Sequence, residues 1–123
     1  MIIRFLIGVP ETLPPSVAER YPELAQARYR RGGIPPRFAG WLLGRPTVAA
    51  VTLWRTIWLG RRVQLDDELL LHEWRHVEQF GASPAFPLMY IWETLRRGYW
   101  MNRFEVEARD YAAQRIRGAR ISP

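Results

Sequence analysis

The sequence of 123 residues predicts a single domain of the α+β class that is mainly α-helical. Three patterns of apolar residues at spacings of three and four predict helices over residues 66–80, 88–97 and 100–116. Residues 47–59, directly before the first of these helices, are rich in Val, Thr, Ile and Trp and predict a β-hairpin. We therefore expect a small sheet followed by helices that pack on one another.

The composition is that of a globular protein, with 48% hydrophobic and 13% aromatic residues. The sequence contains no cysteine, so a metal ion would have to be held by His, Asp or Glu. Residues 1–9 are apolar but too short for a signal-peptide core, and Pro10 interrupts them. No apolar run approaches the roughly 18 residues of a transmembrane helix. These features predict a soluble, cytoplasmic protein.

The charge is unevenly spread along the chain. All 18 basic residues are arginine and the net charge is +6. Residues 1–65 carry ten arginines and three acids, whereas residues 66–123 carry eight arginines and nine acids. A basic first half suits nucleic acid or anionic lipid, but a solvated Arg-rich surface accounts for the same composition. We do not expect nucleic-acid binding, because no known motif accompanies the charge, and peripheral contact with an anionic membrane stays open.

The chain before the hairpin gives less regular patterns. Residues 2–9 predict a short strand or packed arm that ends at Pro10. Residues 22–31 predict a helix, and the Gly-Gly and Pro-Pro pairs within residues 32–36 predict a loop. We expect residues 1–46 to form an extension that packs on the domain.

The first of the three predicted helices has clear ends and two different faces. Asp66 is suited to its N-cap, and Gly81 is suited to its C-terminal end. Leu70, Trp74 and Val77 share one side, which is the side turned away from the two histidines of the chain. The helix can therefore bury one side while it presents the other.

His72, Glu73 and His76 form an HExxH string on this helix, and they include both histidines of the chain. A separation of four places the two imidazoles on one face, where both can reach one metal ion. Two imidazoles bind zinc and leave coordination positions open, and the adjacent Glu73 is then suited to act as general base toward zinc-activated water. A solvated helix face carrying charged residues is the other interpretation of this string.

A third zinc ligand would have to be a carboxylate, since no third histidine exists. Residues 100–116 offer Glu105, Glu107 and Asp110. Glu105 lies about 50° from the centre of the apolar stripe of this helix and Glu107 about 110°. The stripe consists of Phe104, Ala108, Tyr111, Ala112 and Ile116. Glu105 is therefore the expected ligand, and Glu107 remains the alternative.

The remaining C-terminal segments complete the expected fold. The helix over residues 88–97 has an apolar stripe and is broken by Gly98. The stripe consists of Leu88, Ile91, Trp92 and Leu95. Residues 82–87 predict a loop bounded by prolines, and residues 117–123 predict a mobile, Arg-rich tail.

The string His72-Glu73-x-x-His76, followed by a helix with Glu105-x-x-Ala108, resembles the gluzincin metallopeptidases, whose third zinc ligand is a glutamate on a later helix. With Gln79 the string becomes HExxHxxQ, which is similar to small bacterial zincin-like domains. The resemblance covers about residues 47–113.

The resemblance implies a zincin-like fold in which the motif helix packs on the later helix that carries the glutamate. It implies that Zn²⁺ is held by His72, His76 and Glu105, with Glu73 as the base. It also implies a peptide or protein substrate. In such enzymes a sheet beside the motif helix often pairs its edge strand with an extended substrate, although the hairpin could equally serve only to cover the core.

One position departs from the gluzincin pattern. Many gluzincins carry an Asp four residues after the ligand Glu, where it orients a zinc-bound histidine. That position is Arg109 here, or Tyr111 if Glu107 were the ligand. Support for the histidines would then come from Asp110 or a backbone carbonyl. Three tyrosines are candidates for stabilising an oxyanion, namely Tyr90, Tyr99 and Tyr111.

Two functions follow as expectations. The first is a zinc-dependent metallopeptidase, an endopeptidase, that hydrolyses peptide bonds with Glu73 as general base. The second is a zinc-binding zincin-like module with weak or no catalysis, which acts as a binding or scaffold protein, including at a membrane surface. The sequence indicates no oligomeric state.

Overall fold

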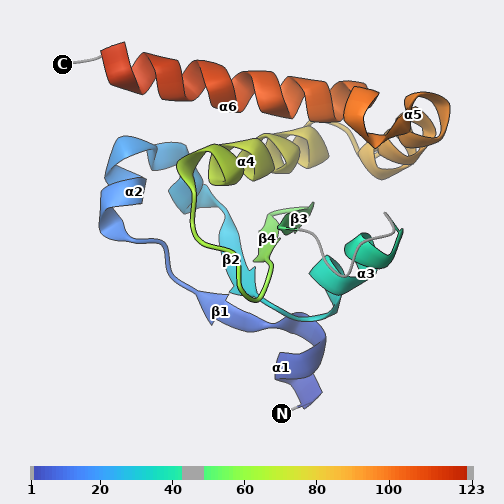
Figure 1. The fold of residues 1–123 in the computed structure, drawn as a ribbon, viewed down its shortest axis with the longest axis horizontal. Coiled ribbons are helices and arrows are strands. Elements are labelled where there is room, and N and C mark those ends of the chain that lie inside the picture. Colours follow the sequence, from blue (N-terminus) through green and yellow to red (C-terminus); the bar gives the residue numbers. More distant parts are fainter. Residues whose placement is uncertain (1, 43–48, 122–123) are drawn as a thin grey trace.

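The computed structural model describes residues 2–42 and 49–121 (Figure 1). This part of the chain is α+β and mainly helical, as predicted. Its elements, in chain order, are α1 (Ile2–Ile7), β1 (Val9–Glu11), α2 (Pro15–Arg20), the 3₁₀ helix η1 (Pro22–Gln26), β2 (Arg28–Arg31), α3 (Ile34–Leu42), β3 (Ala50–Leu53), β4 (Thr56–Leu59), α4 (Asp67–Ala82), α5 (Phe86–Met101) and α6 (Arg103–Ile121).

The four strands form one sheet in the order β1-β2-β4-β3. Strands β3 and β4 are antiparallel and make the predicted hairpin, and β1 is antiparallel to β2. The two central strands, β2 and β4, are parallel. The hairpin turns at Trp54 and Arg55, and Trp54 has a positive φ of 55°. Residues 47 and 48 of the expected hairpin lie outside the described residues.

The prediction of a helix over residues 22–31 is wrong. The chain makes a short 3₁₀ turn after Pro22 and then enters β2, which pairs with β1 on one side and β4 on the other. Tyr29 points into the core, where its hydroxyl donates to the backbone oxygen of Leu24 at 2.7 Å. Pairing with two distant strands and burial of this ring outweigh the local helical pattern.

The first nine residues and the loop at residues 32–36 also differ from expectation. Residues 2–7 are helical, and the strand lies later, with Pro10 inside the edge strand β1, where a missing N–H is tolerated. Gly32 and Gly33 turn the chain with φ of 74° and 86°, but the two prolines that follow belong to the first turn of α3. Proline fits there because the first turn needs no donor.

Residues 1–46 are more than an extension packed on the domain. They supply β1 and the central strand β2, whose residue Arg28 pairs with Thr56 and whose residue Arg31 pairs with Leu59 of β4. The first third of the chain is therefore part of the same sheet as the hairpin.

Helices α4 and α6 lie side by side, and α4 lies between α6 and the sheet (Figure 1). Leu70, Trp74 and Val77 of α4 are buried, as their spacing predicts. Ala108 and Ala112 of α6 are fully buried, and their small side chains let the two helices approach closely. The core thus fixes the relative position of the two helices that carry the candidate ligands.

The C-terminal helices are longer than predicted. Helix α5 begins at Phe86, inside the expected loop, because Pro87 fits its first turn. Gly98 breaks its geometry with φ of 80°, as expected. Helix α6 continues to Ile121, so the prediction of a mobile tail is wrong for residues 117–121, and residues 122–123 lie outside the described part.

Candidate metal centre

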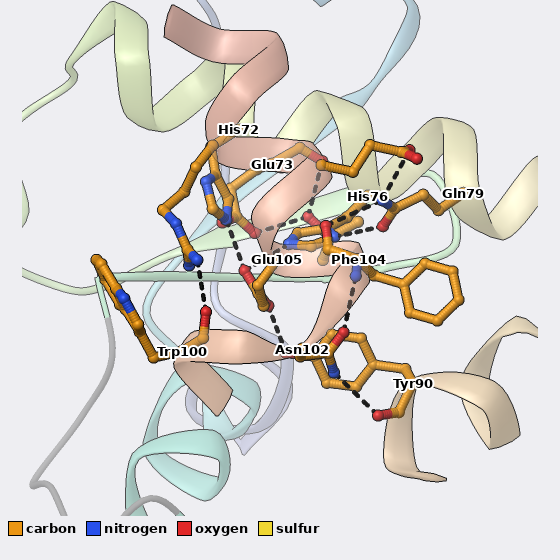
Figure 2. A network of polar contacts seen from close by, with 12 residues as sticks. His72, Glu73, His76, Gln79, Tyr90, Trp100, Asn102, Phe104 and Glu105 are labelled. Atoms are coloured by element: carbon orange, nitrogen blue, oxygen red, sulfur yellow. Dashed lines mark hydrogen bonds and ion pairs between the residues drawn. The ribbon is translucent and has the colours of Figure 1, made fainter. Parts of the chain in front are cut away.

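Two helices bring the candidate ligands together. His72, Glu73 and His76 lie in the middle of α4, and Glu105 lies in the first turn of α6. Figure 2 shows both histidine rings turned toward Glu105. His76, Glu73 and Glu105 are buried, and the side chain of His72 is 16% exposed. The site is therefore reached from the His72 side.

One carboxylate oxygen lies close to both imidazoles. Oε1 of Glu105 is 2.8 Å from Nε2 of His72 and 3.2 Å from Nε2 of His76. His72, Glu73 and His76 each offer one ligand atom within 4.8 Å of the others. Ligand atoms of a tetrahedral zinc site, each roughly 2 Å from the ion, lie about 3.3 Å apart. His72, Glu73 and His76 could therefore hold one metal ion between them.

Gln79 fixes the orientation of the His76 ring. Its amide nitrogen donates to the backbone oxygen of Phe104 and to Oε1 of Glu107, both at 3.1 Å. Since both of these partners only accept, the amide oxygen of Gln79 must face His76, where it lies 2.7 Å from Nδ1. Nδ1 of His76 therefore carries the proton, and Nε2 of the neutral ring is left for a metal ion.

Tyr90 holds the second oxygen of Glu105. Its hydroxyl donates a short hydrogen bond to Oε2, so the carboxylate is fixed at both oxygens. Burial alone would raise the pKa of Glu105, but hydrogen bonds from His72 and His76 and the charge of His76 hold it well below its usual range. Glu105 is thus an anion at neutral pH.

The same contacts that lower the pKa of Glu105 raise the pKa of His76. Burial would lower its pKa, but the hydrogen bond to Glu105 and the negative charges of Glu73 and Glu105 raise it to about 9. A metal ion at this centre would therefore replace a proton on His76.

Glu73 is positioned by a residue of the sheet. The hydroxyl of Thr52, on β3, donates to Oε1 of Glu73 at 2.9 Å. The other oxygen, Oε2, lies 4.0 Å from Nε2 of His72. One oxygen of Glu73 is therefore held by the sheet, and the other faces the histidines.

Asn102 places Glu105 at the centre. It is fully buried and precedes α6, where its side-chain oxygen accepts from the backbone N–H of Phe104 at 2.8 Å. Its side-chain nitrogen donates to the backbone oxygen of Tyr90 at 3.0 Å and to the hydroxyl of Thr94 at 2.9 Å. Asn102 thus caps α6 and ties it to α5. Asparagine followed three residues later by glutamate, as in Asn102 and Glu105, is the sequence pattern by which such a cap can be recognised.

The other two acids of α6 lie elsewhere. Glu107 is half-exposed and pairs with Arg75 at 3.0 Å, and Asp110 is exposed. Arg109, which replaces the Asp of the gluzincin pattern, lies over the ring of Trp100 at 4.0 Å. Support for His76 comes from Gln79, not from Asp110 or a backbone carbonyl.

The three tyrosines considered for an oxyanion are in different surroundings. The hydroxyl of Tyr111 donates to Glu23 at 2.8 Å, and that of Tyr90 donates to Glu105. Burial and then the negative charge of Glu105 raise the pKa of Tyr99 well above its usual range.

Several arginines of the basic first half serve the fold. Arg31 pairs with Glu11 and donates to the backbone oxygens of Gly60 and Val63 at 2.9 and 2.6 Å. Arg30 donates to the backbone oxygen of Ile7 at 2.6 Å.

None of the helices in residues 2–42 and 49–121 is long and apolar enough to cross a bilayer.

Comparison with known protein families, curated proteins and solved structures identifies no relative of this chain. The centre itself consists of two imidazoles, a charged carboxylate close to both, and a second carboxylate, Glu73, beside them.

Proposed function

We propose that this protein is a zinc-dependent metallopeptidase with a zincin-like fold of the gluzincin type. His72, His76 and Glu105 hold the zinc ion, and Glu73 is the general base. The observation that carries the proposal is the position of Glu105, whose Oε1 lies within 3.2 Å of Nε2 of both histidines.

The donor set fits zinc. Two imidazole nitrogens and one carboxylate oxygen are the protein ligands of many catalytic zinc sites, which keep a fourth position open. When bound, zinc would polarise a substrate carbonyl and lower the pKa of a water molecule to about 7. Gln79 and Tyr90 hold His76 and Glu105 in place, so the site needs little rearrangement to accept the ion.

Glu73 is placed to move a proton. Its Oε1 is held by Thr52, so Oε2, on the side of His72, is the atom that takes a proton from the attacking water. The same atom then delivers this proton to the leaving amine. Burial of Glu73 keeps bulk water from competing for the proton.

Strand β3 supports a peptide as the substrate. It is an edge strand of the sheet in the described part of the chain, and Thr52 in this strand contacts Glu73. An extended peptide that paired with β3 would run past Glu73, and main-chain hydrogen bonds would hold it with little dependence on its sequence.

Zinc content tests the ligands. We expect about one zinc per chain in protein purified without a histidine tag, as measured by elemental mass spectrometry. Glu105→Ala should lose the ion or bind it much more weakly, because only the two histidines remain. Asp110→Ala is the matched control, since it removes an exposed acid from the same helix. Absence of zinc from the wild type, even after the metal is added back, would contradict the proposal.

Hydrolysis tests the base. Glu73→Gln should keep zinc and lose at least about a hundredfold in the rate of cleavage of unfolded casein, because the amide cannot take a proton. His76→Ala should lose both zinc and cleavage. Glu68→Gln, an exposed change on the same helix, should cleave like the wild type. Cleavage at the wild-type rate by Glu73→Gln would remove Glu73 from its role.

A second function is favoured by one observation. The hydroxyls of Tyr90 and Tyr111 already donate to carboxylates, so two of the three candidate oxyanion donors are engaged. This arrangement suits a zinc-binding module that acts as a binding or scaffold protein. The module would hold one zinc per chain and cleave no unfolded substrate.

A further inference from the structure

Helix α5 carries its apolar residues on the side that faces solvent. Leu88, Ile91, Trp92 and Leu95, with spacings of three and four, are exposed by 73%, 55%, 61% and 78%. We call these four residues the outer face of α5. The opposite side contains buried Phe86 and the buried acid Glu93. A helix on a globular protein normally turns its apolar stripe to the core, so α5 is inverted.

The exposed charges of α5 are all positive. Arg96 borders the outer face, Arg97 lies on the opposite side of the helix, and Glu93, the only acid of α5, is buried on that opposite side. The backbone N–H of Arg103 donates to Glu93 at 3.3 Å, and Arg97 lies 3.7 Å from the same oxygen. The exposed part of α5 is thus both apolar and cationic.

Exposed aromatic and apolar residues continue beyond the kink at Gly98. Trp100 and Met101 are exposed by 67% and 56%. The guanidinium of Arg109 lies over the ring of Trp100 and adds a further cation at this end of α5. Tryptophan and arginine beside leucine and isoleucine are the side chains that helices place at the boundary between water and lipid.

We propose that the outer face of α5 is a docking surface for an anionic lipid bilayer. The apolar side chains of this face enter the boundary between headgroups and acyl chains, and Arg96 contacts the lipid phosphates. Residues 88–95 span roughly 12 Å, so the helix lies in the plane of the bilayer and does not cross it. This inference is independent of zinc and of hydrolysis.

A second copy of the chain fits this surface less well. A two-fold contact between two copies of α5 would bring Arg96 of both copies together, and α5 exposes no acid to pair with it. A bilayer that contains anionic lipids satisfies the apolar side chains and Arg96 at the same time. Charge complementarity therefore selects the bilayer.

Vesicle binding tests the proposal. Tag-free protein should sediment with vesicles of phosphatidylcholine and phosphatidylglycerol more strongly than with phosphatidylcholine alone, and added salt should weaken the binding. The triple variant Leu88→Gln, Trp92→Gln, Leu95→Gln should bind about tenfold more weakly or worse, because it removes the apolar contact. Arg96→Gln should bind these vesicles about fivefold more weakly than the wild type.

Matched variants control for charge and hydrophobicity elsewhere. Arg61→Gln with Arg62→Gln removes twice that charge from an exposed turn before α4, and the N-terminal end of α4 lies far from α5 (Figure 1). Ile2→Gln with Ile3→Gln removes two exposed apolar side chains from α1. Both double variants should bind vesicles like the wild type. Circular dichroism should show unchanged helix content in every variant.

Three results would overturn the proposal. One is equal binding of the wild type and the triple variant to anionic vesicles. Another is loss of binding in the variant of α1 but not in the triple variant. The third is a wild-type dimer, seen by analytical ultracentrifugation without lipid, that the triple variant converts to a monomer while neither protein binds vesicles. That last result would assign the outer face of α5 to self-association.

Discussion

Gln79 holds His76 with a neutral amide where many zinc sites use a carboxylate. The amide accepts from Nδ1 of His76 and is itself oriented by donation to Phe104 and Glu107. A neutral partner fixes the ring but adds no negative charge beside it. The negative charge near His76 comes instead from Glu73 and Glu105.

Replacement of Gln79 should therefore weaken metal binding without removing a ligand. We expect Gln79→Ala to bind zinc about 10–100-fold more weakly, because the His76 ring loses its orientation. Competition with a zinc-binding dye measures the affinity. Glu78→Ala, an exposed change beside it, is the control and should bind zinc like the wild type. Equal affinity in Gln79→Ala and wild type would show that packing alone orients the ring.

The spacing of residues in sequence was enough to name the candidate ligands but not their supports. One helical face carries His72, Glu73 and His76, and Glu105 is the acid nearest to the apolar stripe of its own helix. The geometry of each single helix is therefore enough to identify these residues as candidates. Thr52, by contrast, reaches Glu73 from a strand, and Tyr90 reaches Glu105 from another helix. Contacts between elements depend on how those elements pack, which periodicity does not encode.

Among the elements, the start of α6 depends most on one side chain. Asn102 makes hydrogen bonds to three groups in a fully buried position. Asn102→Ala should lower the free energy of unfolding by about 2–4 kcal/mol, because the cap is lost and buried polar groups lose their partner. Urea denaturation measures this change. Gln114→Ala, exposed on the same helix, should change stability by less than about 0.5 kcal/mol. A similar small effect for Asn102→Ala would show that water replaces the lost bonds.

Elements with a strong local pattern were predicted well, and those made by distant pairing were not. The motif helix has a clear apolar side, and the hairpin closes over a short turn. The ends of this helix were predicted less well, because Gly81 lies inside it and Asp66 precedes it without a side-chain cap. Strand β2, in contrast, owes its conformation to β1 and β4, which flank it in the sheet. Helix α5 was predicted from its apolar stripe, but the stripe does not reveal that it faces outward.

For the whole molecule, the metal-free centre makes stability depend on pH. The pKa of His76 is raised from 6.5 to about 9 in the folded protein. Protonated His76 therefore contributes fully to the stability of the fold below pH 6.5, and this contribution is lost as the pH rises through about 9. The pKa of Glu105 is lowered from 4.5, so its contribution is present above pH 4.5 and is lost on acidification.

Metal-free protein should therefore become less stable between pH 6.5 and 9, as measured by urea denaturation in the presence of a chelator. His76→Gln should lack this decline, because the substituted side chain does not titrate. A wild-type protein whose stability rises over the same range would contradict the assignment of the proton to His76.

The class of the whole fold followed from the sequence, but the arrangement of its sheet did not. The α+β character follows from one strand-rich stretch before several helical patterns. The parallel pairing of β2 with β4 joins Arg28 to Thr56, and no local signal marks which strands will pair over that distance. Residues 1–46 therefore looked like an addition although they supply a central strand.

The bonds of Asn102 and Tyr90 join the inner side of α5 to Glu105. Any displacement of α5 that accompanies docking therefore acts on the carboxylate, and any shift of the carboxylate acts on α5. Such a connection is a coupling free energy, and it is reciprocal. If zinc strengthens attachment to vesicles by some factor, vesicles strengthen the retention of zinc by that same factor.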